Sequence, residues 1–327
     1  MNFNEAKEQF EKLFNNKMSE NEAKELLSSL YQRGENFEEI AAAAEVMRKN
    51  SIKLDIDESL RDKLIDVVGT GGDKSGSFNV SSTVSLLLAS QGCVVAKHGN
   101  RAITSNSGSA DMLETLGINL NLNTHQQTKM LMECGFTFMF AQSHHLAMKH
   151  IMPIRKSLPH RTIFNILGPL TNPAGAKKYL LGVFDKAYIE NVAKALFRLK
   201  TKKAFVVSSN DFMDEISVSD VTHFAKLEHG EINYGVIDPR EYGIKRSNFL
   251  EIKGADAKVN ANITMDIIKG QEKGAKRDIT LINSAFALVA NESARDIQEG
   301  LEMSKDAISS GKTAQHLKKI IEISNKL

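Results

Sequence analysis

The sequence KHGNRAITSNSGSADMLETLG, from Lys97 to Gly117, places a polar loop between an apolar run and a helical segment. Lys97 stands where the apolar run ends, glycines and hydroxyl residues fill the loop, and Gly117 follows the helical part. Glycine is common just past a helix because it adopts positive φ without strain. The stretch therefore predicts a strand, then a cation-bearing loop, then a helix, and loops of this kind often bind ligands.

A second loop of the same chemistry, GTGGD from Gly69 to Asp73, follows the apolar run at 65–68. Its glycines let backbone amides approach an anion, although such a cluster can also be only a tight turn. Asn79, Ser81 and Ser82 then open a predicted helix, whose free amides and dipole favour phosphate. Two such loops predict an enzyme whose substrate carries more than one phosphate group.

The chain around these loops alternates short apolar runs with helical segments. Strands are predicted at 65–68, 93–96, 136–140, 179–184 and 204–207. Helices are predicted at 84–90, 110–116, 126–133 and 189–199, and again over 283–327. This alternation indicates an α/β fold with a largely parallel sheet, in which active sites lie beyond the carboxyl ends of the strands. Residues 208–260 are mixed and cannot be assigned.

Residues 3–62 show helical periodicity instead. Three apolar stripes recur, and Ser19 with Glu22 and Asn36 with Glu39 have the spacing of capping boxes. At 327 residues the chain is expected to form two domains, or one large domain with a small helical partner.

Composition limits the function classes. The 42 basic and 40 acidic residues leave a net charge of +2, which provides no overall field for nucleic acid or an anionic membrane. Cys93 and Cys134 have no metal-binding spacing and fit core packing in a reducing compartment. The polar start is unlike a signal peptide, and no apolar run reaches the roughly 18 residues of a membrane span. A cytoplasmic protein is expected.

Further candidates for chemistry lie downstream. Asp214 and Glu215 follow the predicted strand at 204–207, and beside a polyphosphate site such a pair fits Mg²⁺, although alone it is more often a solvated loop. Arg155 is a natural bidentate partner for a carboxylate, or else an ordinary surface arginine. The histidines at 144, 145 and 150 lack the spacing of a zinc site, and structural or substrate-wall roles are expected for them.

These motifs together resemble those of the anthranilate phosphoribosyltransferases. GTGGD, FNVSS, the Lys97 to Gly117 block, residues 147–175, the Asp214–Glu215 pair and NSAFALVA occur in that family's order over nearly the whole chain. The KHGNR block and RTIFNILGPLTNPA are the most specific. Ser82 replaces a common threonine, Leu146 replaces a common proline, and the loop before Asp214 lacks a glycine often seen there. None of these departures removes a ligand.

The resemblance implies the fold class of the nucleoside phosphorylases and phosphoribosyltransferases. A helical domain over 1–64, joined by helices from about 145–175, would face an α/β domain over 65–327 with the active site between them, and the helical part would form a homodimer. The implied reaction transfers the phosphoribosyl group of phosphoribosyl pyrophosphate (PRPP) to the amine of anthranilate, in tryptophan biosynthesis. No residue acts as a covalent nucleophile or strong general base in that expectation.

The resemblance also implies site residues. Anthranilate would contact Gly69, His98, Asn100 and Arg155, and Mg²⁺, with two ions per subunit, would bind Ser81, Asp214 and Glu215. The residues that would hold PRPP are Gly69, Gly72, Asp73, Ser77, Asn79, Val80, Ser81, Ser82, Lys97, His98, Gly99, Asn100, Arg101, Ala102, Ile103, Thr104, Ser105 and Ser109.

Two alternatives share the fold. A pyrimidine nucleoside phosphorylase would exchange phosphate and a nucleobase at the ribose C1, but its lysine loop carries a serine-glycine-arginine-glycine run instead of HGNR, and it lacks the acidic pair. A non-catalytic relative that binds nucleic acid would be expected to show a basic excess and degraded GTGGD or acidic motifs. This chain has a net charge of +2 and both motifs intact.

Overall fold

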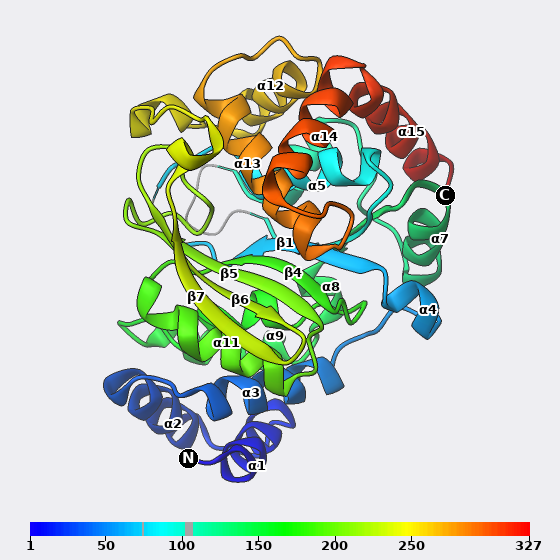
Figure 1. The fold of residues 1–327 in the computed structure, drawn as a ribbon. Helices are drawn as coiled ribbons and strands as arrows, with labels where there is room; N and C mark the ends of the chain where they lie inside the picture. The colour runs from blue at the N-terminus through cyan, green and yellow to red at the C-terminus, as the bar shows by residue number, and fades with distance from the viewer. Residues whose placement is uncertain (74, 102–106) are drawn as a thin grey trace.

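The computed structural model of the chain describes residues 1–73, 75–101 and 107–327. Ala102, Ile103, Thr104 and Ser105, expected at the PRPP site, lie outside the described residues. The N-terminal helices lie below a central sheet, and the C-terminal helices cover it from above (Figure 1).

The N-terminal helices are α1 (Phe3–Phe14), α2 (Glu20–Arg33), α3 (Phe37–Lys49) and the short α4 (Glu58–Arg61). Both predicted capping boxes are confirmed at the starts of α2 and α3. On α2, Ala23, Leu27 and Leu30 are buried, whereas Tyr31, predicted to lie on the same apolar stripe, is 47% exposed. Helix α3 contacts α1 and α11, and its residues 41–44 are four fully buried alanines, whose small side chains allow close helix packing.

One seven-stranded sheet, in the order β3-β2-β1-β4-β5-β6-β7, forms the centre of the molecule. The predicted parallel part is confirmed in β1 (Leu64–Gly69), β2 (Val94–Gly99), β3 (Phe136–Phe140), β4 (Lys178–Gly182) and β5 (Lys203–Ser209). Strand β2 extends three residues past the predicted end, and β4 stops before Phe184. These bounds place Lys97 inside a strand.

An antiparallel hairpin fills part of the segment that the sequence left unassigned. It consists of β6 (Thr222–Glu228) and β7 (Glu231–Ile237), joined through His229 and Gly230. Both turn residues have positive φ, 51° and 82°, as two-residue hairpin turns that match strand twist require. The hairpin adds two antiparallel strands to the edge of an otherwise parallel sheet.

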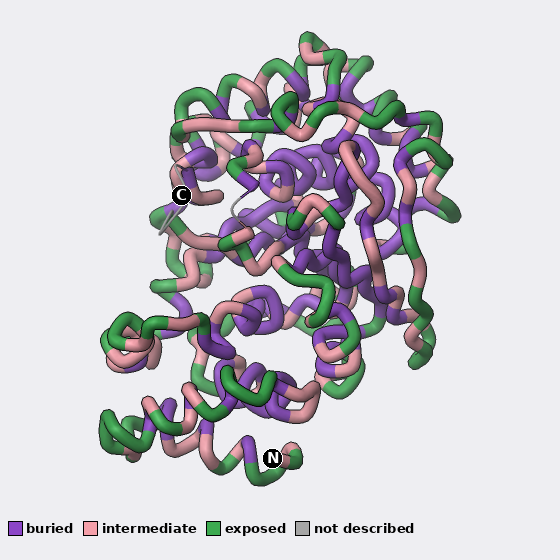
Figure 2. Tube along the Cα trace, turned by 90° about the vertical axis from the view of Figure 1, so that its left-hand side faces the viewer, coloured by how far each residue is buried: buried purple, intermediate pink, exposed green. Residues whose placement is uncertain are grey.

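Helices cover both faces of this sheet. One face carries α5 (Val80–Ser90) and α13 (Ala275–Ala290), and α11 (Ile189–Arg198) with α3 covers the other. Buried residues concentrate in these central layers (Figure 2). The remaining helices are α6 (Ser109–Thr115), α7 (Thr124–Cys134), α8 (Ala141–His144), α9 (Met148–Ser157), α10 (Phe164–Leu167), α12 (Ala257–Ile268), α14 (Ile297–Ser309) and α15 (Lys312–Lys326). Short 3₁₀ helices are η1 (Gly168–Leu170), η2 (Lys186–Tyr188), η3 (Pro239–Tyr242) and η4 (Phe249–Ile252).

Alternation along β1 and β2 defines the two faces near the loops. Val95 packs into the core under α5, whereas Ala96 belongs to the core on the opposite side, with α3 and α11. Because successive strand residues point to opposite faces, Lys97 and His98 also diverge. No helix in the described part of the chain combines the length and apolar character of a bilayer span.

Candidate active site

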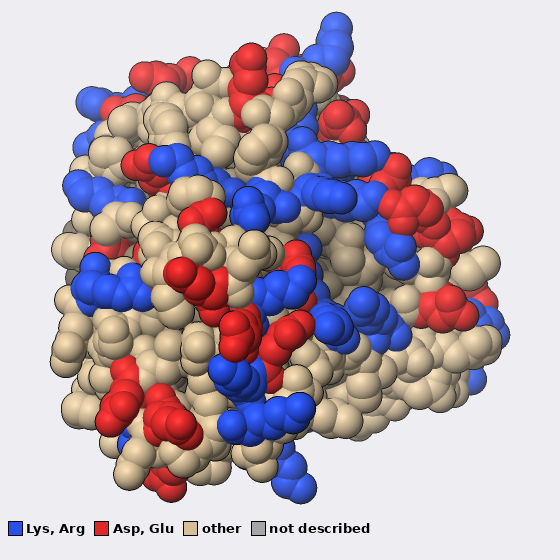
Figure 3. Space-filling view, turned by 90° about the horizontal axis from the view of Figure 1, so that it is seen from below, with Lys and Arg blue, Asp and Glu red and all other residues tan. Residues whose placement is uncertain are grey.

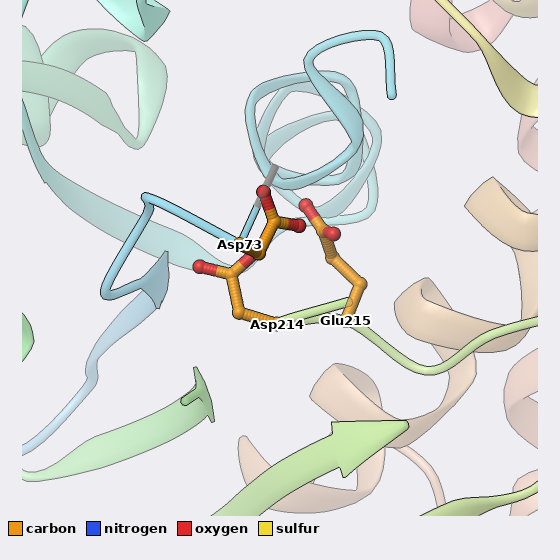
Figure 4. A group of neighbouring side chains, drawn as sticks. All are labelled: Asp73, Asp214 and Glu215. Carbon is orange, nitrogen blue, oxygen red and sulfur yellow. The ribbon is translucent and has the colours of Figure 1, made fainter. Parts of the chain in front are cut away.

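Three carboxylates meet at the carboxyl ends of the strands. Asp73 comes from the loop after β1, and Asp214 and Glu215 come from the loop after β5. One oxygen from each lies within 4.8 Å of the others, and Figure 4 shows the three side chains converging from the two loops. The sequence predicted the Asp214–Glu215 pair as metal ligands but placed Asp73 only with PRPP.

Glycines make room for Asp214. A Cβ at Gly69 would collide with the Asp214 carboxylate, and a Cβ at Gly182 would collide with the Asp214 main chain. The amide of Gly71 donates a hydrogen bond of 2.7 Å to the same carboxylate. The GTGGD loop therefore has a structural role in addition to any contact with a ligand. It holds the Asp214 side chain at the carboxyl ends of β1 and β4.

The carboxylates of the acidic cluster repel one another, and the nearby charge of Lys97 offsets this repulsion only in part for Glu215. Burial raises the pKa of Asp214, and the neighbouring Asp73 raises it further. Burial, followed by repulsion from Asp214 and Asp73, raises the pKa of Glu215 well above its usual range. Oε2 of Glu215 is buried and has no hydrogen-bond partner among the described residues. A hard divalent cation such as Mg²⁺ binds to carboxylate oxygens. This cluster offers several of them, and one is buried without a hydrogen-bond partner among the described residues.

Lys97 links strand β1 to helix α5 close to the acidic cluster. Its side chain is 1% exposed, and Nζ donates hydrogen bonds to the Val67 carbonyl at 2.8 Å and the Ser81 hydroxyl at 3.3 Å. Burial lowers its pKa to about 8, opposed by the negative charges of Asp66, Glu215 and Asp214. Lys97 thus provides a buried ammonium group beside Ser81 and the acids.

His98 points to the other face of the sheet. Its Nδ1 lies 3.1 Å from the carbonyl oxygen of Gly168 in η1, and its ring centre lies 5.2 Å from that of His145. Burial lowers the pKa of His98 well below its usual value, and the nearby His145 adds to the effect. Nε2 of His98 is buried without a hydrogen-bond partner in the described ranges. This face therefore presents neutral imidazoles.

The two polar loops are joined through Asn79. Its side-chain oxygen accepts hydrogen bonds from the Ser107 hydroxyl at 3.2 Å and from Asn260 of α12 at 2.9 Å. At the other end of the second loop, the Ser109 hydroxyl donates to the Asn100 carbonyl at 3.2 Å. Asn260 was not predicted from the sequence, because it lies in a helix far along the chain with no motif around it.

Some predicted residues have other contacts in the structure. Arg101 is exposed, and its guanidinium forms ion pairs with Glu114 and Asp111, which raise its pKa. Val80 is fully buried, and its amide donates to the Phe78 carbonyl at 2.7 Å. The backbone of Ser77 forms an isolated antiparallel β-bridge with that of Lys253, outside the named strands.

Helix α5 also starts at Val80 rather than at Val84, so Ser81 and Ser82 lie in its first turn. Ser82 is buried, and its hydroxyl has no partner among the described residues. Asn79 occupies the N-cap position, but its side-chain oxygen accepts from Ser107 and Asn260 and makes no capping hydrogen bond to the helix.

Arg155 is half-buried on α9. Its guanidinium lies 5.2 Å from the ring centre of Phe164, and Nη1 lies 3.3 Å from the sulfur of Met152. Burial alone lowers its pKa to about 10, and no carboxylate in the described part pairs with it. Phe164 begins α10, which leads directly into η1 and the His98 contact. A desolvated guanidinium on this side fits an anionic ligand group.

Family models match both parts of the chain. The model "Glycosyl transferase family, a/b domain" matches residues 61–314, and "Glycosyl transferase family, helical bundle domain" matches residues 1–51. Together with the mostly parallel sheet and the acidic cluster at its carboxyl edge, these matches define a glycosyl transferase of this two-part class.

Individual relatives narrow the class. The chain is 42% identical to anthranilate phosphoribosyltransferase of Xanthobacter autotrophicus, over 99% of this chain and 92% of that protein. The crystal structure of anthranilate phosphoribosyltransferase from Thermus thermophilus superposes with a TM-score of 0.93 at 35% identity, covering 99% and 96% of the two chains. The structure of anthranilate phosphoribosyltransferase from Saccharomyces cerevisiae in complex with PRPP and Mg superposes with a TM-score of 0.85 at 27% sequence identity. The match covers 94% of this chain and 86% of that chain. The chain belongs to the anthranilate phosphoribosyltransferase family.

Proposed function

We propose that the protein transfers the phosphoribosyl group of PRPP to the amine of anthranilate, giving N-(5-phosphoribosyl)anthranilate and pyrophosphate. The observation that carries this proposal is the cluster of Asp73, Asp214 and Glu215, with Asp214 buried and the other two partly exposed, beside the ammonium group of Lys97. Such a site suits a metal-complexed polyphosphate, whereas the phosphorylase alternative does without the acidic pair. The pathway would be tryptophan biosynthesis, in the cytoplasm.

PRPP would lie on the face that carries Lys97 and α5. The loop amides, the hydroxyls of Ser81 and Ser82, and Asn79 surround the start of α5, where the helix dipole favours phosphate. Displacement at the ribose C1 builds negative charge on the departing pyrophosphate, so fixed donors and Lys97 assist most where that charge develops. Arg101, paired with Glu114 and Asp111, would act through the position of its loop rather than as a free cation.

Mg²⁺ would be held by Asp214 and Glu215, with Asp73 and the Ser81 hydroxyl beside them. The unsatisfied oxygen of Glu215 supports this assignment, and two ions per subunit would neutralise the cluster together with the pyrophosphate. Bound Mg²⁺ would supply charge stabilisation of the leaving group.

Anthranilate would lie on the opposite side of β2, near His98. The guanidinium of Arg155, which forms no ion pair with a carboxylate among the described residues, is proposed to pair with the anthranilate carboxylate, with Asn100 and Gly69 near the reacting amine. An aromatic amine is neutral at pH 7 and needs positioning more than deprotonation. A neutral His98 is consistent with that requirement.

We also propose that residues 1–64, with helices from about 145–175, form one domain, and that this domain makes a homodimer. Helix α9 contacts α1 and α2. A hollow between α1 and α2 is lined by Met18 and Leu26 among polar residues, which fits a mixed interface. On the face seen from below, basic and acidic side chains are interspersed (Figure 3).

The test is a fluorescence assay. The protein is mixed with Mg²⁺, PRPP and anthranilate, and the loss of anthranilate fluorescence is followed while each component is omitted in turn. Transfer that requires all three supports the proposal. Phosphate-dependent cleavage of thymidine, or no consumption of anthranilate by the complete mixture, would contradict it.

A further inference from the structure

Arg161, the first residue of RTIFNILGPLTNPA, contacts the GTGGD loop, although no role was predicted for it from the sequence. It lies between α9 and α10, and its Nη2 donates a hydrogen bond of 2.6 Å to the carbonyl oxygen of Gly72. The face of its guanidinium lies 3.8 Å from the ring centre of Phe184, so the planar group is stacked as well as hydrogen-bonded. Stacking and a directed donor fix an arginine more firmly than charge alone, and a lysine cannot reproduce both.

The Gly72 end of the loop depends on this contact. Thr70 is tied by its amide to Gly182 at 3.0 Å, and its hydroxyl accepts from the Phe184 amide at 3.0 Å. Gly71 is tied to Asp214, but Gly72 has no hydrogen bond besides that from Arg161 within the described part of the chain. Gly71 and Gly72 both have positive φ, 66° and 69°, which only glycine adopts freely. A segment with so much conformational freedom needs an external anchor.

The neighbouring residue anchors the same segment to the helical part. His160 stacks on Tyr31 of α2, with ring centres 4.2 Å apart and planes at 8°, and its Nε2 lies 3.3 Å from the Ser28 hydroxyl. On the other side, Phe184 packs against Tyr188 at 5.3 Å. Residues 160 and 161 therefore join helix α2 to the loop that holds Asp73.

We propose that Arg161 is a positioning residue, which acts through the Gly72 carbonyl to hold the loop amides and Asp73 in their binding arrangement. The identity of the ligand, PRPP with its metal, rests on the proposed function. The positioning itself rests on the contacts of Arg161 and does not depend on that identity.

The kinetic test compares two stacked arginines. Arg198 lies 3.9 Å from the ring centre of Phe3 in the same kind of stack, is exposed like Arg161, and is therefore a matched control. Arg161→Ala should raise the KM for PRPP about tenfold, the factor expected for losing one charge-assisted hydrogen bond, while the KM for anthranilate stays within about twofold. Arg198→Ala should leave both constants unchanged. Equal PRPP constants in the two variants would overturn the proposal.

A lysine variant separates position from charge. Arg161→Lys keeps the positive charge but loses the planar stack on Phe184, so its KM for PRPP should also rise. Wild-type kinetics in this variant would show that charge alone suffices and would contradict the proposal.

Hydrogen exchange decides the positioning without any activity. In the substrate-free protein, the amides of residues 70–73 should exchange faster in Arg161→Ala than in Arg198→Ala, while those of β4 should be unchanged. Unchanged exchange at 70–73 would overturn the proposal even if transfer is confirmed. If the wild type shows no transfer, the proposed function fails, and this comparison still decides the role of Arg161.

Discussion

The two faces of the sheet at the end of β2 differ in how they handle charge. On the Lys97 face, three carboxylates and a buried ammonium group lie close together, and burial with repulsion from neighbouring acids raises the pKa values of Asp214 and Glu215. On the His98 face, the imidazoles are neutral, and Arg155 is a cation without a carboxylate partner among the described residues. One strand thus separates a half suited to a metal and phosphates from a half suited to an aromatic acid.

The largest effect is expected from a substitution in the acidic cluster on the Lys97 face. Asp214→Asn should lower kcat by roughly a hundredfold or more, because charge stabilisation of the leaving group is lost. Steady-state kinetics at saturating Mg²⁺ measure this effect. Asp220→Asn, outside the acidic cluster, is the control and should retain wild-type turnover. Near-wild-type turnover in Asp214→Asn would show that the cluster is only structural.

A substitution on the His98 face should change a different kinetic constant, the KM for anthranilate. Arg155→Ala should raise the KM for anthranilate by roughly tenfold to a hundredfold, because a desolvated guanidinium no longer meets the carboxylate. The KM for PRPP should stay within about twofold of the wild-type value. Lys156→Ala, the next residue on α9 and exposed, is the matched control. A parallel rise of both constants in Arg155→Ala would remove the distinction between the two halves.

The thermal stability of the protein should depend on pH and Mg²⁺ through the acidic cluster on the Lys97 face and not through Arg155 on the His98 face. The pKa values of Asp214 and Glu215 are raised in the folded protein. The protonated carboxyl groups therefore contribute to the free energy of unfolding below their unfolded-state pKa values, and this contribution is lost as the pH rises through their folded-state pKa values. Mg²⁺ should therefore raise the Tm of the substrate-free protein more at pH 8 than at pH 5, where protons compete with it. Thermal unfolding with and without Mg²⁺ tests this.

Asp214→Asn should reduce the Mg²⁺ effect at pH 8, and Arg155→Ala should leave it intact. An equal Mg²⁺ effect at both pH values would argue against binding at the acidic cluster.

The smallest expected effect concerns the loop that carries the acids. Phe212 is 71% exposed and has a φ of 68°, a conformation that costs a phenylalanine about 1 kcal/mol or more. Phe212→Gly should raise the free energy of unfolding by about 0.5 kcal/mol, the strain relief less the entropic cost of glycine. Urea unfolding measures the change, and kinetics should be unaltered. A destabilised Phe212→Gly would mean that the exposed ring makes a contact worth more than the strain.

The sequence predicted the parallel strands, the helical N-terminus and its capping boxes, because those depend on local periodicity and on residues three apart. It also predicted the Asp214–Glu215 pair, since adjacent acids after a strand are visible in the chain. The addition of Asp73 to this cluster was not visible, because a contact between loops so far apart in the sequence depends on which strands become neighbours.

Other differences between prediction and structure have separate causes. The hairpin of β6 and β7 was missed because its turn, His229-Gly230, is not one of the Asn-Gly, Asp-Gly or Gly-Gly pairs that signal a two-residue hairpin. Lys97 was predicted to end its strand, although β2 runs on to Gly99, because polar residues inside a strand look like a loop until their partners are known. Arg161 was missed for the same reason: its partners, Gly72 and Phe184, lie in other segments.

The most direct measurement is calorimetric titration of PRPP into the wild type, Asp214→Asn and Arg155→Ala, with and without Mg²⁺. The prediction is that the wild type and Arg155→Ala bind PRPP in a Mg²⁺-dependent manner with similar affinity, whereas Asp214→Asn loses the Mg²⁺-dependent part. Equal Mg²⁺-dependent affinity in all three proteins would contradict the assignment of metal and phosphates to the Lys97 face.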